Sequence, residues 1–311
     1  MIPQLSACIP CFREPPEMIQ AAVTSAAAQL PAGSELLILP NGPEAISAVE
    51  RVTIPEEARV SPSEERLSMA SSWNRCLNAS RGALIHILHA DDALAPGFYT
   101  TILNLAERYP QRSLYAAGFG LLGEDPPRTV GGEVLLLAGE EAGRFLLAGE
   151  RHCCGSVVVS RHAFQDSGGF RDEYPYGPDE EAYLRYAATS GLAFDPRPLY
   201  RERQHAAQNR FGAWKSPDFV AIYLAGRVDG ARHFGDALVR IAEHSTSRGV
   251  ISLAVTLALQ GDGATGLRRL RDLAQCYPEC SSWPRFRLAK IACRFRGAAR
   301  VAALRRSLLL Q

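Results

Sequence analysis

The chain has 311 residues, of which 47% are hydrophobic and 22% are charged, and its formal net charge is +1. This is the composition of a globular protein with a sizeable core, and the length favours two structural units. A net charge so close to zero excludes a general electrostatic attraction to nucleic acid or to acidic surfaces.

No apolar run reaches the ~18 residues that a membrane-spanning helix needs. The N-terminus, MIPQLSACIP, lacks the basic segment and the long apolar core of a secretory signal. We therefore expect a cytoplasmic protein whose eight cysteines are free thiols. Cys8 and Cys11 form a C-x-x-C pattern, which also occurs in redox and zinc sites. No second such pair accompanies it, and Cys8 lies within an apolar run, so buried thiols are the favoured interpretation.

The first forty residues predict the start of an α/β sheet. Residues 5–9 form a short apolar run that a proline ends, and residues 35–39 form a second run that is followed by Pro40, Asn41 and a glycine. Between them, residues 18–30 carry alanine and apolar side chains at helical spacing. A strand, a helix and a second strand in this order are typical of a parallel sheet covered by helices.

The segment GALIHILHADDALAPGF, at residues 82–98, contains the most informative pattern. Its apolar part, residues 83–88, favours a buried strand of a parallel sheet, although periodicity alone is also compatible with a helix. Asp91 and Asp92 then leave the carboxyl end of that strand, where open α/β sheets bind ligands. Adjacent carboxylates repel each other, and a divalent cation bound to phosphate oxygens would offset the repulsion. The alternative is that the pair caps a helix beginning a few residues later.

The same kinds of signal predict alternating helices and strands up to about residue 212. Predicted helices cover residues 68–80, 98–108, 140–147 and 180–189, and predicted strands cover residues 114–122 and 157–160. Residues 199–209 are charged and are not predicted as a strand. Beyond residue 214 the pattern is entirely helical, with helices expected at residues 219–244, 250–259, 265–276 and 286–310. We therefore expect two domains, residues 1–213 and residues 214–311.

Four motifs together carry a resemblance to a known family. They are IPCFRE at residues 9–14, SWNRCLNASRG around Asn74, HADD at residues 89–92, and GGFRDEYPYGPDEEAYLR at residues 168–185. In this order and spacing they resemble the family 2 inverting glycosyltransferases, over about two thirds of the chain. The resemblance implies a GT-A fold, which is a Rossmann-like mixed sheet flanked by helices, here with an all-helical C-terminal extension.

The resemblance also implies a function. The enzyme would be a metal-dependent, hexosyltransferase-like glycosyltransferase that moves a sugar from a nucleotide-sugar donor to a hydroxyl of a glycan or lipid-linked acceptor. Such enzymes build surface polysaccharides and other glycans. The family places Mn²⁺ or Mg²⁺ at the carboxylates after this strand, here Asp91 and Asp92, and often adds a histidine after the last sheet element, here His205. The donor-binding residues implied in the same way are Pro10, Cys11, Phe12, Glu14, Asn41, Asn74, Asp91 and Arg203.

The acceptor hydroxyl must lose a proton, and the family uses an aspartate at the start of a helix as general base, with an arginine six residues later. Asp179 and Arg185 fit this spacing, and Glu180 is the second candidate base. The structural alternative is that Asp179 only caps the helix, and the two roles are compatible.

Three positions depart from the family pattern. Pro40 stands where an aspartate commonly reads the nucleobase, His89 stands where an aspartate is frequent, and Arg13 replaces the usual asparagine. With His89, metal ligation is left to Asp91 and Asp92. These departures keep open a catalytically silent relative that binds a nucleotide or a glycan and acts through its helical tail. A nucleotidyltransferase would need a basic, glycine-rich phosphate loop after the first strand, and CFREPP is not one.

The C-terminal segment is strongly basic, with no Asp or Glu from Cys280 to Gln311. Residues 285–311 interleave arginines with apolar side chains, and such an amphipathic helix can lie on an anionic membrane surface. This interpretation predicts a peripheral protein at the inner face of the plasma membrane. The alternative is that the apolar stripe packs against the rest of the protein while the arginines remain solvated. Nucleic-acid binding is not expected, because no nucleic-acid-binding module accompanies the charge.

Overall fold

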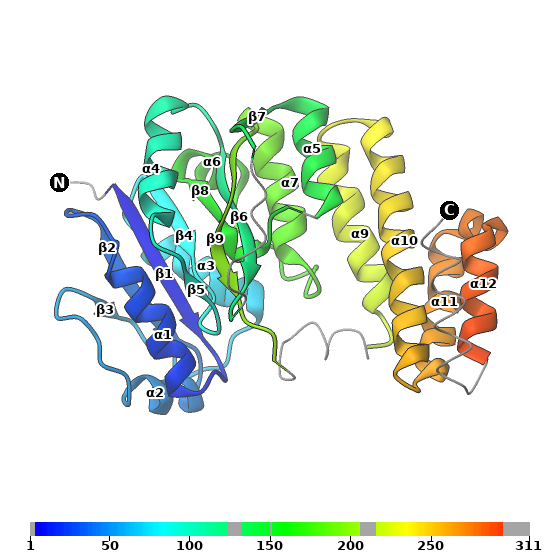
Figure 1. Cartoon of the computed structure of the whole chain (residues 1–311), viewed down its shortest axis with the longest axis horizontal. Helices are drawn as coiled ribbons and strands as arrows, with labels where there is room; N and C mark the ends of the chain where they lie inside the picture. The colour runs from blue at the N-terminus through cyan, green and yellow to red at the C-terminus, as the bar shows by residue number, and fades with distance from the viewer. Residues whose placement is uncertain (1–3, 124–131, 150, 206–215, 295–311) are drawn as a thin grey trace. The chain divides into compact units, whose positions relative to one another are not determined.

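The computed structural model describes residues 4–123, 132–149, 151–205 and 216–294 (Figure 1). The chain divides into two compact units, Met1–Ala206 and Ala207–Gln311. The domain boundary expected between residues 213 and 214 lies outside the described residues.

Within its described residues, the first unit contains a nine-stranded mixed sheet in the order β3-β2-β1-β4-β8-β6-β9-β5, with β7 paired to β9. The strands are β1 (Leu5–Cys11), β2 (Glu35–Pro40), β3 (Arg59–Val60), β4 (Leu84–Ile87), β5 (Ala93–Leu94), β6 (Leu114–Leu121), β7 (Leu135–Leu137), β8 (Val157–Ser160) and β9 (Leu192–Glu202). The predicted β4 does pair in parallel with β1, but its other neighbour, β8, is antiparallel. The sheet is therefore mixed, as the family resemblance implies.

Helices flank this sheet (Figure 1). They are α1 (Pro16–Ala27), α2 (Pro43–Val49), α3 (Met69–Ala79), α4 (Phe98–Arg108), α5 (Gly139–Ala148), α6 (Arg161–Ser167) and α7 (Pro178–Ser190), with a short 3-10 turn η1 (Cys154–Ser156). Proline stands at the first turn of α1, α2 and α7, where its missing N–H costs no helical hydrogen bond.

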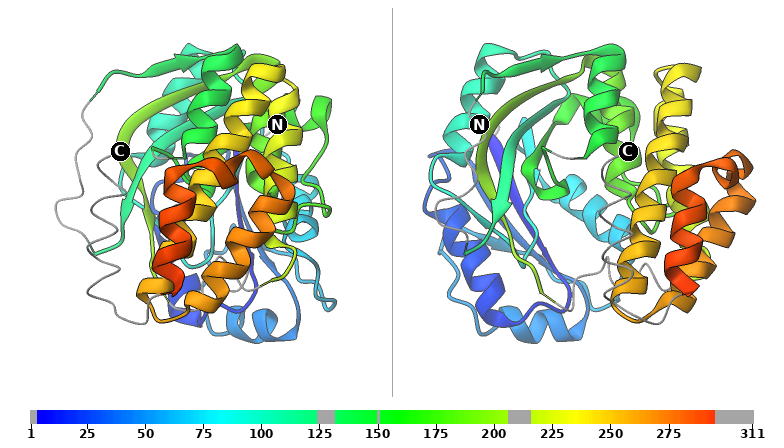
Figure 2. Two further views of the ribbon diagram at one scale, coloured as in Figure 1. Left: turned by 90° about the vertical axis from the view of Figure 1, so that its right-hand side faces the viewer. Right: turned by 45° about the vertical axis from the view of Figure 1, so that its right-hand side comes forward.

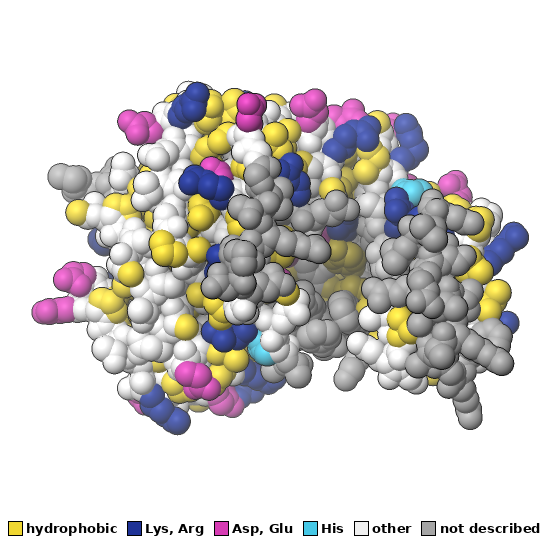
Figure 3. Space-filling view, in the orientation of Figure 1, with side chains coloured by type: hydrophobic (Ala, Val, Ile, Leu, Met, Phe, Trp, Pro, Cys, Tyr) yellow, Lys and Arg dark blue, Asp and Glu magenta, His cyan; other side chains and the backbone are white. Residues whose placement is uncertain are grey.

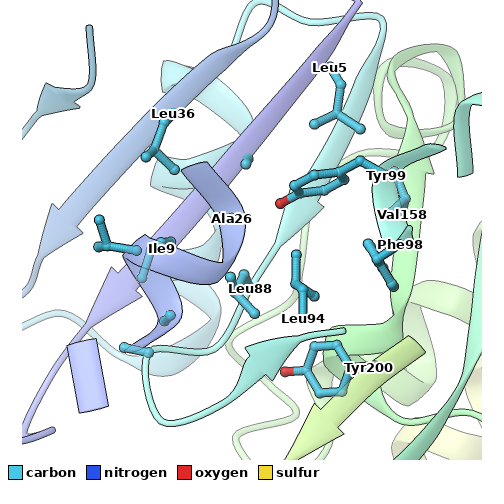
Figure 4. Close-up of a cluster of buried hydrophobic side chains, with 14 of the residues drawn as sticks. Leu5, Ile9, Ala26, Leu36, Leu88, Leu94, Phe98, Tyr99, Val158 and Tyr200 are labelled. Atoms are coloured by element: carbon cyan, nitrogen blue, oxygen red, sulfur yellow. The ribbon is translucent and has the colours of Figure 1, made fainter. Parts of the chain in front are cut away.

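The main hydrophobic core lies on one face of the sheet. Because strand side chains alternate between faces, Leu5 and Ile9 of β1 point to the same side. There they join apolar side chains of α1 and α4, among them Ala26 and Phe98 (Figure 4). Cys8 is also fully buried, so β1 is covered on both faces, which explains its unbroken apolar sequence.

Strand β9 was not predicted from the sequence. Its segment, LAFDPRPLYRE, contains two prolines and four charged residues, which are depleted in strands. It pairs in parallel with β6, and the pairing register shifts around Gly118, where the prolines interrupt the ladder. The expected charged loop at residues 199–209 is therefore a strand as far as Glu202.

The second unit is all-helical in its described part, as the fold class predicts. It contains α9 (Phe219–Arg232), α10 (Asp236–Leu259), α11 (Gly263–Cys276), a 3-10 turn η2 (Pro278–Ser282) and α12 (Pro284–Arg294), which lie side by side (Figure 2). The single helix expected over residues 219–244 is wrong. The chain breaks at Gly235, which has a φ of 99° that favours glycine, and α10 then continues through residues 245–249.

No described helix is both long enough and apolar enough to cross a membrane. On the face shown in Figure 3, basic and acidic side chains are interspersed over the described surface, in keeping with the net charge of +1.

Candidate active site

Asp91 and Asp92 lie between β4 and β5, beside the end of β9. β5 runs antiparallel to β9, with Leu94 opposite Tyr200, and this pairing brings the end of β9 to the two carboxylates. The alternative role as a helix cap does not apply, because α4 begins only at Phe98 and its N-cap is a glycine.

Both carboxylate oxygens of Asp92 accept hydrogen bonds from β9 and the residue that follows it. Oδ1 accepts from the backbone N–H of Arg203 at 2.7 Å, and Oδ2 accepts from the hydroxyl of Tyr200 at 2.5 Å. The side chain is almost completely buried. Burial raises the pKa of Asp92 to about 6, the charge of His89 opposes this rise, and the charge of Asp91 adds to it.

His89 completes a cluster with the two aspartates, whose potential ligand atoms all lie within 4.8 Å of one another. The imidazole stacks on Trp73 with ring centroids 5.6 Å apart, and its Nδ1 lies 3.7 Å from Asp92 Oδ2. Its Nε2 is buried and has no hydrogen-bond partner among the described residues. The sequence predicts ligation by Asp91, Asp92 and His205, and it does not predict His89 as a ligand. The position of His89 two and three residues before the aspartates, after a buried strand, was the signal that could have identified it.

His205 and Arg203 both contact Asp91. His205 Nε2 lies 3.0 Å from Asp91 Oδ2, and Arg203 Nε donates to the Asp91 carbonyl oxygen at 2.8 Å. The structure thus brings Arg203 and His205 to Asp91 and Asp92, although more than one hundred residues of sequence separate the two pairs.

Four of the predicted donor-binding residues lie at the end of β1 and just after it: Pro10 and Cys11 are its last two residues, and Phe12 and Glu14 follow in the loop. Glu14 Oε2 accepts a hydrogen bond from the Phe12 N–H at 2.6 Å, which closes the loop. Burial raises the pKa of Glu14, and the charge of Asp91 contributes to this rise, so Glu14 lies within electrostatic range of the metal-ligand candidates.

The structure confirms the expectation that the cysteines of the C-x-x-C pattern are free, buried thiols. Cys8 and Cys11 are both free and fully enclosed. Burial raises the pKa of the Cys11 thiol well above its usual range, which disfavours the thiolate that redox chemistry or zinc binding would use.

Two asparagines are expected at the donor site. The side-chain amide of each one both donates and accepts a hydrogen bond with the backbone of a distant segment. Asn41 donates to the Leu67 carbonyl at 3.1 Å and accepts from the Leu67 N–H at 2.8 Å. Asn74 makes the same pair of bonds with Phe170, both at 2.8 Å. Each asparagine therefore holds a distant loop in place.

Asp179 and Glu180 lie in the first turn of α7 and line a pocket. Its wall consists of Leu146, His152, Cys154, Asp179, Glu180, Tyr183 and Leu184. Burial raises the pKa of Asp179 to about 6, and the neighbouring charge of Glu180 adds to this rise. The nearby His89 lowers it, so the pocket lies within electrostatic range of the aspartate cluster. The expected capping role is not seen, because the N-cap is Gly177. No sequence motif had pointed to His152.

Arg185 holds the turn that precedes α7. Its guanidinium forms a bidentate ion pair with the buried Glu181, with both bonds at 2.8 Å. It also donates to the carbonyl oxygens of Gly168 at 3.1 Å and Gly169 at 2.7 Å. The arginine six residues after Asp179 therefore fixes the Gly-Gly-Phe turn and the position of the helix start.

Comparisons with known proteins identify the family of the chain. The family model for glycosyl transferase family 2 matches residues 6–167, which is over half of the chain. A relative, "Uncharacterized protein MT1568" of Mycobacterium tuberculosis, is 25% identical over 229 residues, covering 66% of this chain and 68% of that protein.

Two solved structures share the fold. S. aureus TarS (residues 1–349), in complex with UDP-GlcNAc, superposes with a TM-score of 0.66 at 14% identity, covering 98% of this chain and 92% of that one. The mannosyltransferase PcManGT from Pyrobaculum calidifontis, in complex with GDP-Man and Mn²⁺, has a TM-score of 0.57 at 15% identity, covering 99% and 88%. The chain has the GT-A fold and belongs to glycosyl transferase family 2.

Proposed function

We propose that this glycosyltransferase is metal-dependent and inverting, and that it transfers a hexose from a nucleotide-sugar donor to an acceptor hydroxyl in surface polysaccharide or other glycan synthesis. The observation that carries the proposal is the cluster of His89, Asp91 and Asp92 at the carboxyl end of β4, within electrostatic range of the Asp179 carboxylate. The nucleotide sugars bound by TarS and PcManGT support the class of donor.

The residues present fit a divalent cation. His89 Nε2 is buried and lacks a hydrogen-bond partner in the described part of the chain, and two carboxylates with an imidazole are ligands that suit Mn²⁺. Asp91 and Asp92 would hold Mn²⁺ or Mg²⁺, with His89 or His205 as a further ligand. Bound there, the ion would supply positive charge that stabilises the departing nucleoside diphosphate.

Asp179 is the proposed general base, and Glu180 is the second candidate. With a pKa raised to about 6, Asp179 is mostly ionised at neutral pH and is still a stronger base than an ordinary aspartate. It would accept the proton of the acceptor hydroxyl while that oxygen forms a bond to the anomeric carbon and the bond to the diphosphate breaks. A single displacement from the opposite face inverts the configuration at this carbon.

The end of β1 and the loop after it would bind the donor through Pro10, Cys11, Phe12 and Glu14. Arg203 would contact the diphosphate of the donor. Asn41 and Asn74 would act by holding the loops that border the same space, since their amides are engaged with backbone groups. Asp91 would serve both the metal and the donor.

The acceptor hydroxyl would enter the pocket at the start of α7. Leu146, Tyr183 and Leu184 make one part of its wall apolar, and Asp179 and Glu180 make the other part acidic. A glycan or a lipid-linked acceptor would place its reacting hydroxyl against the acidic part. Residues 1–213 would form the catalytic domain, and residues 214–311 the helical region that brings the enzyme to the cytoplasmic side of an anionic membrane.

A thermal-shift panel of nucleotide sugars, each with and without Mn²⁺, tests the proposal. A donor that binds only the native state raises the melting temperature. We expect at least one nucleotide sugar to do so only with Mn²⁺, and NMR of the product formed from that donor to show an inverted anomeric configuration. Stabilisation that is independent of metal, or a retained configuration, would refute the corresponding part of the proposal.

A further inference from the structure

We infer that Tyr200 is a positioning residue, which holds the Asp92 carboxylate in the orientation that metal binding requires. The inference rests on the metal dependence proposed above. No motif in the sequence pointed to Tyr200, which lies in the strand that the sequence did not predict.

The contact itself is short and buried. The Tyr200 hydroxyl donates to Asp92 Oδ2 at 2.5 Å, across 108 residues of sequence, and the Tyr200 side chain is completely buried. Its ring lies in the main core beside Phe98, with centroids 6.5 Å apart (Figure 4). Because the Arg203 N–H holds Oδ1 at the same time, two donors fix the plane of the carboxylate.

The backbone beside Tyr200 is shaped for this hydroxyl. A Cβ atom added to Gly155 would lie 2.0 Å from the Tyr200 oxygen and 2.4 Å from its Cζ, so no other residue fits there without moving the ring. Gly155 thus leaves the space through which the phenol reaches Asp92.

Gly155 is in turn held by a buried histidine of β4. The Gly155 carbonyl oxygen lies 2.7 Å from His86 Nε2, and His86 Nδ1 lies 3.0 Å from the Tyr99 hydroxyl. A carbonyl can only accept, so Nε2 carries the proton and Nδ1 accepts from Tyr99. Burial lowers the pKa of His86 to about 4, which keeps this ring neutral with a single proton. The hydrogen bonds from Tyr99 through His86 to the Gly155 carbonyl are therefore mutually consistent, and they hold the glycine against which Tyr200 packs.

Groups that orient a ligating carboxylate contribute strongly to a metal site. Loss of such a partner typically lowers metal affinity or activity about 10- to 100-fold. Tyr200→Phe removes the hydroxyl and preserves the buried ring, so its effect reports on orientation more than on packing.

Equilibrium dialysis with Mn²⁺, in the absence of donor, tests the inference on the full chain. We expect Tyr200→Phe to bind Mn²⁺ about 10-fold more weakly or worse. We expect its kcat to recover at saturating Mn²⁺, because a site with a misoriented ligand can still be filled. Gly155→Ala, which displaces the same hydroxyl from the other side, should weaken Mn²⁺ binding in the same way.

Tyr115→Phe is the matched control. The Tyr115 side chain is also buried within the sheet and donates a hydrogen bond of 2.8 Å, but to the Tyr109 carbonyl, away from the aspartates. Its loss should lower stability without changing Mn²⁺ affinity.

The inference is overturned if Tyr200→Phe and Tyr115→Phe bind Mn²⁺ within twofold of each other, or if excess Mn²⁺ does not restore kcat in the Tyr200 variant. Failure of the wild-type chain to bind Mn²⁺ is a distinct result. It would refute the metal dependence proposed above, and this inference with it.

Discussion

The side-chain amide of Asn74 forms two hydrogen bonds with the backbone of Phe170, both 2.8 Å long and spanning 96 residues of sequence. They tie α3 to the turn that leads into α7 and its Asp179. The neighbouring Gly169 is part of this contact, because a Cβ atom there would lie 2.1 Å from the Asn74 amide oxygen.

Asn74→Ala should therefore lower both stability and turnover. It leaves the N–H and the carbonyl of Phe170 without their partner, at a cost of about 1–3 kcal/mol in the free energy of unfolding. Urea denaturation and steady-state kinetics measure the two effects. Asn78→Ala, at an exposed position of the same helix, is the control and should change neither. Equal behaviour of the two variants would contradict the tethering role.

Asp179→Asn should abolish transfer and leave Mn²⁺-dependent donor binding nearly unchanged. The amide preserves the shape of the side chain but cannot accept the acceptor's proton. Isothermal titration with donor and Mn²⁺, followed by a turnover assay, separates the two properties. Glu180→Gln is the comparison and should retain most of the activity. If Glu180→Gln is the inactive variant, the base assignment moves to Glu180.

The raised pKa of Asp179 also predicts how stability depends on pH. Its folded value of about 6 lies above the reference value of 3.8, so the folded state binds the extra proton in this range. The stability that this group contributes is present below about pH 4 and is lost as the pH rises through about 6. At pH 7.5, Asp179→Asn should therefore raise the free energy of unfolding, by no more than about 3 kcal/mol.

Denaturation curves of wild type and Asp179→Asn at several pH values check this prediction. The difference between the two proteins should shrink as the pH falls, because the wild-type carboxyl then becomes neutral as well. Taking the difference removes the contribution of Asp92, which titrates in the same range in both proteins. A difference that does not depend on pH would show that the Asp179 pKa is not raised.

His89 and His205 should differ in their effect on metal affinity. Of the two, His89 belongs to the set of described ligand atoms that lie within 4.8 Å of one another, whereas the described contact of His205 is with Asp91 at 3.0 Å. We expect His89→Ala to weaken Mn²⁺ binding about 10-fold or more, and His205→Ala to weaken it less. Calorimetric titration of both variants gives the comparison. The reverse order would make His205 the third ligand.

Residues 295–311 should contribute to binding of anionic membranes. They continue the basic segment beyond α12, whose own apolar residues, such as Phe286 and Ala289, are buried where α12 packs against α10 and α11. A deletion that starts at residue 295 therefore retains these packed residues of α12. In flotation with anionic liposomes, the full chain should float and the deletion variant should float less, with the difference reduced by salt. Equal flotation of both would argue against the membrane role.

Five elements of the first unit could be predicted from short sequence patterns alone. β1, α1, β2, β4 and α4 each have an apolar run or a helical period bounded by proline or glycine, and the structure has all five. HADD and the segment containing Asp179 could be identified in the same way, because each is a short motif at the end of one element. The family and the fold followed from the order of these motifs.

Features that depend on residues far apart in the sequence could be seen only in the tertiary structure. β9 contains prolines and charges and is a strand because β6 and β5 pair with it, so no local signal could predict it. Tyr200 therefore reaches Asp92 through a pairing that the sequence does not display. His89, which from the sequence was a departure from the family pattern, is a ligand candidate because the turn after β4 brings its ring beside the aspartates.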